Sequence, residues 1–418
     1  MPEFLTLLPP DQAREKLFAH LFTFESDPDL VNVIHALNRV TADDIFAPHP
    51  LPDFPRTTVD GYAVRAKDTF GASDSLPAYL HLIGESPMGD SPAFEVGAGQ
   101  CALIHTGGML PKGADSVVML EYTQPVGAKE IEIFKSVADG ENLIRVGEDV
   151  VQGQLVIPKG TLIRPAEIGG LMALGITEMR VSRKPRVGLI STGDEVVDPS
   201  ATPRLGQVRD INTYTLGALV EKNGGEALRY GIFSDNFEVL KNAAARALFD
   251  CDVVIITAGS SASTRDMTAE VIRQLGEPGV LVHGINTRPG KPTILGVCSG
   301  KAVIGLPGNP VSALVNGYLF VVPIIEKLLG ALPRPKATIQ AKLTVNLSSQ
   351  AGREDWQPVK LSPSPASGRG AMGEGFLAEP IFGKSNLIFT LAAADGLLRI
   401  HPDATGLSAG EIVEVVLI

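Results

Sequence analysis

The sequence predicts a multidomain α/β and β protein whose central part is a three-layer α/β domain with a mostly parallel sheet. Three observations support this prediction. From 187 to 329, short apolar runs alternate with helical patterns. From 78 to 134, short strands lie between glycine turns, and after Pro333 the helical patterns stop and strand-like runs follow. Strands that alternate with helices are typical of a parallel sheet, and 418 residues correspond to about three domains of ordinary size.

Composition limits the functional classes. A net charge of −11 argues against nucleic acid as a partner. No run of 18 apolar residues and no signal-peptide pattern is present, so we expect neither a membrane span nor secretion. Cys101, Cys251 and Cys298 show no paired spacing and are expected to be buried thiols in a reducing compartment, which predicts a cytoplasmic protein. No catalytic triad, zinc motif, Walker loop or dinucleotide fingerprint occurs.

Before the central domain, helical spacing covers Pro9 to Asn38 with a break at Pro28. The Asp60-Gly61 step predicts a turn before a strand at 62–64. Pro165 indicates the start of a short helix that ends at Leu174.

In the central domain, runs of β-branched residues predict the strands. Apolar residues at helical spacing, together with capping residues at the helix start, predict the helices. The predicted strands are 187–191, 227–233, 253–257, 280–285 and 302–305. The predicted helices are 212–222, 236–249, 267–275 and 310–329. In the tail we expect strands at 337–347, 359–361, 376–381 and 411–418, with a loop at 362–375.

The segment DVVIITAGSSASTRD, Asp252 to Asp266, combines a buried strand with a small, hydroxyl-rich loop. Gly259, Ser260 and Ser261 follow the strand, and Asp266 precedes the predicted helix. Such a loop at the carboxyl end of a parallel strand offers N–H and hydroxyl groups to an anion. An ordinary turn, with Asp266 as a helix cap, explains the same residues.

Three predicted strands end in polar turns, at 192–195, 259–266 and 307–310. Carboxyl ends of parallel strands share one edge of the sheet, so Asp194, Glu195 and Asp266 can approach one another. Carboxylates beside phosphate are how proteins hold Mg²⁺, although each could also be a helix cap or a turn residue.

Basic and constrained residues lie in two further loops. Arg288 and Lys291 belong to RPGKP, a stiff loop that presents two cations in an acidic chain. The turn Pro307-Gly308-Asn309-Pro310 leads into a helix that carries Ser312 in its first turn, where N–H groups can face an anion. These residues predict a phosphate-bearing or oxyanionic ligand, with Mg²⁺, at one edge of the sheet.

In their order, the motifs resemble those of the molybdopterin molybdenumtransferase family (MoeA-like), which includes the E domain of gephyrin. The resemblance lies in VDGYAV at 59–64, TGGMLPKGADSVVM at 106–119, RVGEDV at 145–150, STGDEVV at 191–197, RPGKP, GLPGNPVSA at 305–313 and SNLIFTLAAADGLLRI at 385–400. It extends over nearly the whole chain.

The resemblance implies a four-domain organisation: residues 1–50 with 141–183 form an elongated domain, 51–140 an inserted β domain, 184–329 the molybdopterin-binding α/β domain, and 330–418 a C-terminal β-barrel. It further implies a homodimer with its active site at the subunit interface, and the molybdopterin adenylyltransferase as a further partner.

The implied reaction inserts molybdate into the dithiolene of adenylylated molybdopterin, with Mg²⁺-dependent release of AMP. By motif, Arg288, Lys291, Ser312 and Ser385 match molybdate-site positions. Polar cleft positions are matched by Asp60, Thr106, Asp149, Glu195 and Asp266. Of these, the carboxylates are the predicted catalytic residues, Glu195 and Asp266 being the predicted metal ligands.

The chain departs from the family pattern at 55–59, at Gly259 to Thr264, and at Pro358, where a second arginine is expected after Arg353. Thr264 takes the place of a glycine, and a threonine does not readily adopt positive φ. The alternative functions are a non-catalytic molybdopterin-binding or scaffold protein of the same fold and a tungstate-preferring paralogue.

Overall fold

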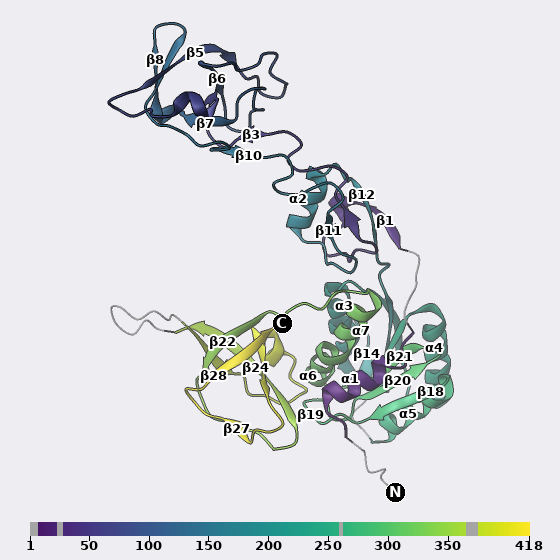
Figure 1. Cartoon of the computed structure of the whole chain (residues 1–418). Coiled ribbons are helices and arrows are strands. Elements are labelled where there is room, and N and C mark those ends of the chain that lie inside the picture. Colours follow the sequence, from purple (N-terminus) through teal and green to yellow (C-terminus); the bar gives the residue numbers. More distant parts are fainter. Residues whose placement is uncertain (1–6, 23–27, 259–261, 365–374) are drawn as a thin grey trace. The chain divides into compact units, whose positions relative to one another are not determined.

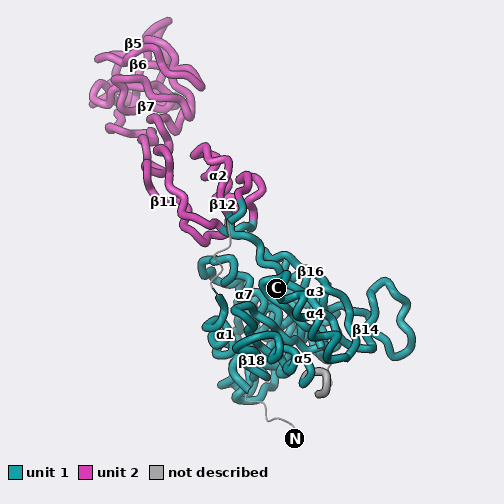
Figure 2. Tube along the Cα trace, turned by 90° about the vertical axis from the view of Figure 1, so that its right-hand side faces the viewer, with its two compact units in different colours: residues 1–29, 38–40, 181–418 teal, residues 30–37, 41–180 magenta. Residues whose placement is uncertain are grey.

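The computed structural model describes residues 7–22, 28–258, 262–364 and 375–418, and for 262–265 the backbone only. Two compact units are present (Figure 2): unit 1 comprises residues 1–29, 38–40 and 181–418, and unit 2 comprises residues 30–37 and 41–180. The predicted four-domain division stays a prediction. Each unit is described below by itself.

Unit 2 contains a six-stranded sheet in the order β7-β4-β6-β5-β9-β8. This sheet confirms the predicted small β region. Its strands are β4 (Gly61–Val64), β5 (Ala78–Glu85), β6 (Gln100–Ile104), β7 (Ser116–Met119), β8 (Thr123–Val126) and β9 (Glu130–Ile133). Buried side chains such as Tyr62, Leu80 and Ile131 form its core. Burial raises the pKa of the Cys101 thiol in this core to about 12, and all three cysteines are free and buried as expected.

The remaining elements of this region are short. They are β1 (Asp29–Asn32), η1 (Val33–His35), β2 (Ile45–Phe46), β3 (Arg56–Thr57), η2 (Ala66–Thr69), η3 (Leu120–Tyr122), β10 (Leu143–Ile144), β11 (Leu155–Ile157), α2 (Pro165–Ala173) and β12 (Glu178–Val181). The predicted helical spacing up to Asn38 is wrong after Pro28: residues 29–32 pair with β12, and only a single 3₁₀ turn follows, at which Asn32 accepts a hydrogen bond from the Ile34 N–H. Strand pairing therefore overrides the local period.

Unit 1 contains the predicted α/β sheet, in the order β16-β13-β17-β21-β20-β18. Its strands are β13 (Arg186–Thr192), β16 (Glu226–Phe233), β17 (Val253–Ala258), β18 (Pro278–His283), β20 (Ile294–Cys298) and β21 (Lys301–Pro307). Strand β17 is buried along its whole length and pairs in parallel with β13 and β21. The sheet is mostly parallel because β20 alone among these six runs against its neighbours.

Strand β20 was not predicted from the sequence. It forms a hairpin with β21 through Ser299 and Gly300, both with positive φ, and Cys298 pairs with Lys301 across the turn. A two-residue turn with positive φ at both positions matches the twist of the strands it joins. In the sequence, the Ser299-Gly300 step between two apolar runs is the feature that indicates this hairpin.

Helices cover both faces of this sheet (Figure 1). Helices α4 (Phe237–Asp250) and α5 (Ala262–Leu275) pack on one face with the core around Val254 and Ile272. The remaining helices of this part are α1 (Pro10–Phe18), α3 (Asn212–Lys222), α6 (Pro310–Asn316), the π-helical turn η4 (Gly317–Val321) and α7 (Val322–Leu328). Helix α3 is capped by Asp210, which accepts hydrogen bonds from the N–H and hydroxyl of Thr213, rather than by Asn212 or Thr213.

One helix in the described part of the chain, Pro310–Leu328, is long and apolar enough to span a membrane by length and composition alone. Its most apolar window is 61% buried inside the protein, and it packs against β21 and α3. This is the burial expected of a core helix.

The tail forms the predicted closed β-barrel, in which β24 pairs with both β25 and β26. Its elements are β22 (Thr338–Leu343), β23 (Leu347–Ser348), β24 (Glu354–Pro363), β25 (Phe376–Pro380), α8 (Phe389–Ala392), β26 (Gly396–Ile400), β27 (Gly406–Leu407) and β28 (Ile412–Leu417). Most of the predicted loop at 362–375 lies outside the described residues. The small pair β14 (Val196–Val197) and β15 (Val208–Arg209) and the strand β19 (Thr287–Arg288) complete unit 1.

Replacing Gly290 by alanine should destabilise the protein. Gly290 has a φ of +105°, and an added Cβ would lie 1.7 Å from the Asn316 Nδ2 atom. Gly330 also has positive φ, +65°, but no atom lies within 4 Å of an added Cβ. In chemical denaturation, Gly290→Ala should therefore lower the free energy of unfolding by about 1–3 kcal/mol more than Gly330→Ala, because only the former overpacks a buried site. Equal losses would contradict the close approach.

Candidate functional site

A pocket of about 920 Å³ in unit 1 contains many of the predicted site residues. It lies between the end of the α/β sheet and the barrel. Among the sequence-predicted residues, its lining includes Arg288, Lys291, Pro307, Asn309, Ser312 and Ser385. Segments that are almost one hundred residues apart along the chain therefore meet at one concave surface, and we refer to it as the cationic pocket.

Hydrogen bonds hold the RPGKP loop at one wall of the cationic pocket. Thr287 and Arg288 pair in parallel with Glu354 and Asp355 of β24. The buried Asn316 side chain donates to the Pro289 carbonyl over 3.2 Å, and the Thr293 hydroxyl donates to the Gly290 carbonyl over 2.8 Å. The loop is thus fixed at both ends, as its two prolines predicted.

Ser385 is held at the start of α6. The Val311 N–H donates to the Ser385 carbonyl over 3.0 Å, and the Asn309 side-chain amide donates to the Ser385 hydroxyl, also over 3.0 Å. Ser312 is buried one residue further along the helix. Because Pro310 has no N–H and that of Val311 is already used, the helix start offers fewer free donors to an anion than the sequence predicted.

The charges in the cationic pocket are predominantly positive. Its basic side chains are Arg288, Lys291, Arg353 and Lys384, and its one acidic side chain is Asp355. The buried Asp355 carboxylate accepts hydrogen bonds from the Arg353 guanidinium over 2.7 and 3.0 Å, and Arg288 Nη1 lies 3.8 Å from it. An excess of cations in a concave site attracts an anion into it.

The sequence did not identify Asp355 or Lys384 as site residues. Asp355 stands two residues after Arg353, in the arginine-bearing segment, and Lys384 immediately precedes Ser385. Their positions beside these motif residues are the sequence features that could have identified them as site residues. Gly308, next to Asn309, accepts a hydrogen bond from the Asn212 side chain over 2.8 Å at its carbonyl.

The carboxyl edge of the sheet gathers acidic residues, as predicted, but the set differs. Asp194 and Glu195 follow β13 and are exposed, and the Asp194 carboxylate accepts a hydrogen bond from the Asp235 N–H over 3.2 Å. Partial desolvation and the negative charges of Asp194 and Glu195 raise the pKa of Asp235. Asp235, which follows β16, was missed because it reads as an ordinary polar turn residue.

Asp266 is exposed and lies inside α5, which begins at Ala262 rather than at Met267 as predicted. It is therefore one turn into the helix instead of at its start. Asp266 is not among the charges that shift the Asp235 pKa. The predicted anion-loop residues Gly259, Ser260 and Ser261 lie outside the described residues.

In unit 2, the structure brings Asp60 and Thr106 together. The Thr106 N–H and hydroxyl donate to the same Asp60 oxygen over 2.7 and 3.0 Å, and His105 Nδ1 lies 3.7 Å from it. The other ring nitrogen of His105 lies 3.2 Å from a Glu85 oxygen. The Thr106 hydrogen bonds, backbone first, lower the pKa of Asp60.

Asp149 stays apart from this cluster. Its N–H donates to the Leu51 carbonyl over 3.0 Å. The Asp149 carboxylate is exposed and makes no hydrogen bond or ion pair with any described residue. Among the described residues, none therefore holds the Asp149 carboxylate in position for its predicted role.

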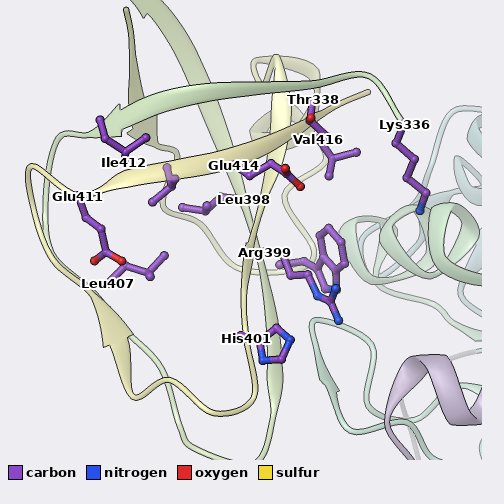
Figure 3. Close-up of a pocket in the computed structure, with 12 residues that line it drawn as sticks. Lys336, Thr338, Leu398, Arg399, His401, Leu407, Glu411, Ile412, Glu414 and Val416 are labelled. Atoms are coloured by element: carbon purple, nitrogen blue, oxygen red, sulfur yellow. The ribbon is translucent and has the colours of Figure 1, made fainter.

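A second cavity, of about 590 Å³, lies on the barrel and contains none of the predicted site residues (Figure 3). Arg399 projects into it beside the Trp356 ring. The buried Glu354 carboxylate binds both the Arg399 guanidinium and the Trp356 ring N–H. The cavity lining also contains Lys336 and two carboxylates, Glu411 and Glu414. The cationic pocket, with four basic side chains and one carboxylate in its lining, is therefore the better anion site.

Three family models match successive parts of the chain. Models of the MoeA N-terminal region (domain I and II), a probable molybdopterin binding domain and the MoeA C-terminal region (domain IV) match residues 8–175, 188–327 and 340–418. A putative molybdopterin biosynthesis protein of Methanocaldococcus jannaschii is 38% identical over 93% of this chain and 92% of its own length. The molybdopterin molybdenumtransferase of Haemophilus influenzae is 35% identical over 83% of this chain and 84% of its own.

Solved structures give the same result. A crystal structure of a molybdopterin biosynthesis moeA protein from Pyrococcus horikoshii has a TM-score of 0.85 at 32% identity, covering 99% of this chain and 100% of that chain. A further P. horikoshii structure has a TM-score of 0.79 at 38% identity and covers 99% of both chains. The predicted fold class and the predicted family resemblance are both confirmed.

Replacing Glu195 by glutamine should lower the pKa of Asp235, because one of the negative charges that raise it is removed. A raised folded-state pKa gives a stability contribution that is complete below the unfolded-state pKa and is lost as pH rises through the folded-state value. The variant should therefore lose less stability over that pH range. Carboxyl NMR titration and denaturation between pH 3 and about 7 test this, with Glu238→Gln as the matched control.

Replacing Thr106 by valine should raise the pKa of Asp60 towards its ordinary value, since the hydroxyl donor is lost and the N–H donor is kept. A lowered folded-state pKa gives stability that is present above the unfolded-state pKa and is lost as pH falls through the folded-state value. This loss should begin at higher pH in the variant. NMR titration of the Asp60 carboxyl measures the shift, and an unchanged titration with Thr106→Val would refute the assignment. Thr58→Val serves as the control.

Proposed function

The chain belongs to the molybdopterin molybdenumtransferase family, and we propose that it inserts molybdate into the dithiolene of adenylylated molybdopterin with Mg²⁺-dependent release of AMP. The cationic pocket is the observation that carries this proposal. It combines Arg288, Lys291, Ser312 and Ser385 at one concave surface, and a tetrahedral oxyanion is bound by cations and hydroxyl donors of this kind.

Within this proposal, the pocket residues bind and orient molybdate. The stiff RPGKP loop holds the backbone of Arg288 and Lys291, which therefore has little conformational freedom to lose on binding. The Ser385 hydroxyl accepts a hydrogen bond from Asn309 and can direct its own hydrogen to an oxygen of the oxyanion. Holding the oxyanion close to the dithiolene lowers the entropic cost of their reaction.

The acidic edge of the sheet fits Mg²⁺. This ion prefers oxygen ligands, keeps several waters and is commonly held by one or two carboxylates together with substrate phosphate. Desolvation, followed by the negative charges of Asp194 and Glu195, raises the pKa of Asp235, and a divalent cation would offset that negative charge. No group of His, Cys, Asp or Glu in the described ranges is already arranged around a metal position. We assign Glu195, from its place in this acidic group, and Asp266, from its match to the family motif, as the residues that would hold Mg²⁺, which would neutralise phosphate charge during AMP release.

The proposal extends to the assembly. We propose a cytoplasmic homodimer whose active site lies at the subunit interface, with the four-domain division given above and with the molybdopterin adenylyltransferase as the source of the substrate. Family membership supports these parts. By their family motifs, we assign the exposed Asp60–Thr106 cluster and the exposed Asp149 carboxylate to the surface that the other subunit contributes to this interface site, where they would contact a polar ligand.

AMP release tests the proposed reaction. With adenylylated molybdopterin, molybdate and Mg²⁺, the wild-type chain should release AMP, and it should not do so when molybdate or Mg²⁺ is omitted. Asp266→Asn should lower the rate by about 10²–10³-fold, as expected for removal of a group that acts on the charge developing in the reaction, and keep its melting temperature. Glu270→Gln, one turn further along α5, is the matched control. Binding of the substrates without AMP release would show a non-catalytic protein, and full activity of Asp266→Asn would remove Asp266 from the site.

A further inference from the structure

Lys384 lines the cationic pocket and has no role in the reaction as described above. We propose that Lys384 is an oxyanion-binding residue that acts together with Lys291 and adds a second uncompensated ammonium group to the recognition of the substrate dianion. This inference rests on the proposed function, because it names a further residue for the same pocket. Of the four cations in the pocket, the two arginines lie beside the Asp355 carboxylate, and the two lysines pair with no described carboxylate.

The two arginines of the pocket share one carboxylate. Asp355 is buried, binds Arg353 through two hydrogen bonds and lies 3.8 Å from Arg288. Removing either arginine from Asp355 would leave a buried carboxylate with less compensation, which is costly. Arg353 is therefore held in place by Asp355, and part of the positive charge of the two arginines is already compensated within the protein.

The two lysines are different. Lys291 and Lys384 are exposed and form no ion pair or hydrogen bond through their ammonium groups with any residue in the described part of the chain. Each carries one full positive charge on a flexible stem, so together they match the charge of a dianion such as molybdate. Both charges are uncompensated until an anion binds.

The backbone on which Lys384 stands is held in place. The next residue, Ser385, is bonded to Asn309 and Val311 at the start of α6, and the Leu387 N–H donates to the Lys384 carbonyl over 3.0 Å. On the other side, the Ile381 N–H donates to the Pro358 carbonyl over 2.9 Å. Pro358 lines the pocket but carries no charge. In the neighbouring stretch 381–385, which also lines the pocket, Lys384 is the residue that supplies a positive charge.

The same chemistry could serve the phosphate of the pterin substrate. We assign Lys384 to the inorganic oxyanion because its neighbour Ser385 shares the pocket with Lys291 and Ser312. These residues together provide two cations and two hydroxyls, a donor set suited to a small tetrahedral dianion.

The test compares Lys384→Gln, Lys384→Arg and Lys291→Gln in the full chain, with Lys360→Gln as a control for an exposed lysine of β24 outside the pocket. AMP release is measured against molybdate concentration, and molybdate binding is measured by titration calorimetry. Lys384→Gln should raise the KM for molybdate and weaken molybdate binding about 10- to 100-fold, the loss expected for one charge-assisted hydrogen bond. Its kcat and its KM for adenylylated molybdopterin should change little.

Lys384→Arg should restore most of the affinity, since a charge is kept, and Lys360→Gln should behave as wild type. The melting temperature should be unchanged because the Lys384 side chain is exposed. If Lys291→Gln loses molybdate affinity while Lys384→Gln keeps it, this inference is wrong and the proposed reaction stands. A higher KM for adenylylated molybdopterin with unchanged molybdate affinity would also overturn it, in favour of the pterin phosphate. A wild-type chain that neither binds molybdate nor releases AMP would overturn the proposed function itself.

Discussion

Two hydrogen bonds to Ser385 connect the parts of unit 1 that form its cationic pocket. Val311 and Asn309, at the end of β21 and the start of α6, hold the carbonyl and hydroxyl of a residue that belongs to the C-terminal region. The parallel pairing of β19 with β24 connects the same parts a second time. Because the pocket walls come from both parts, its shape depends on these contacts, and loosening them would separate Lys291 and Ser312 from Lys384 and Ser385.

Buried polar groups help to fix this arrangement. Asn316 binds the Pro289 carbonyl, and Asp355 holds Arg353 in place. Such groups are costly to bury unless they are satisfied, so each of them allows few alternative arrangements of the loop it contacts. These hydrogen bonds hold the backbone of the pocket, while its two lysine side chains are exposed and can adjust to a bound anion.

Much of the fold could be predicted from local pattern. The helix at 212–222 has the predicted bounds, and β17 is the fully buried parallel strand that its β-branched run indicated. The failures have local causes. Residues 29–32 carry apolar spacing that fits a helix, but pairing with β12 makes them a strand. The start of α5 was placed too late because the polar residues after Ser261 were interpreted as loop.

The sequence by itself determined the kinds of group available at the site: the two cations of RPGKP, the hydroxyls of Ser312 and Ser385, and carboxylates after the parallel strands. Strand direction was enough to place the carboxylates at one edge of the sheet, whereas Ser385 was assigned by its match to the family motif. Only the tertiary structure decided that Asp355 pairs with Arg353 and lies near Arg288, that Lys384 stays uncompensated, and that Asp235 joins Asp194 and Glu195. Ion pairing and desolvation depend on distances between side chains far apart in the chain, and such distances exist only after the chain has folded.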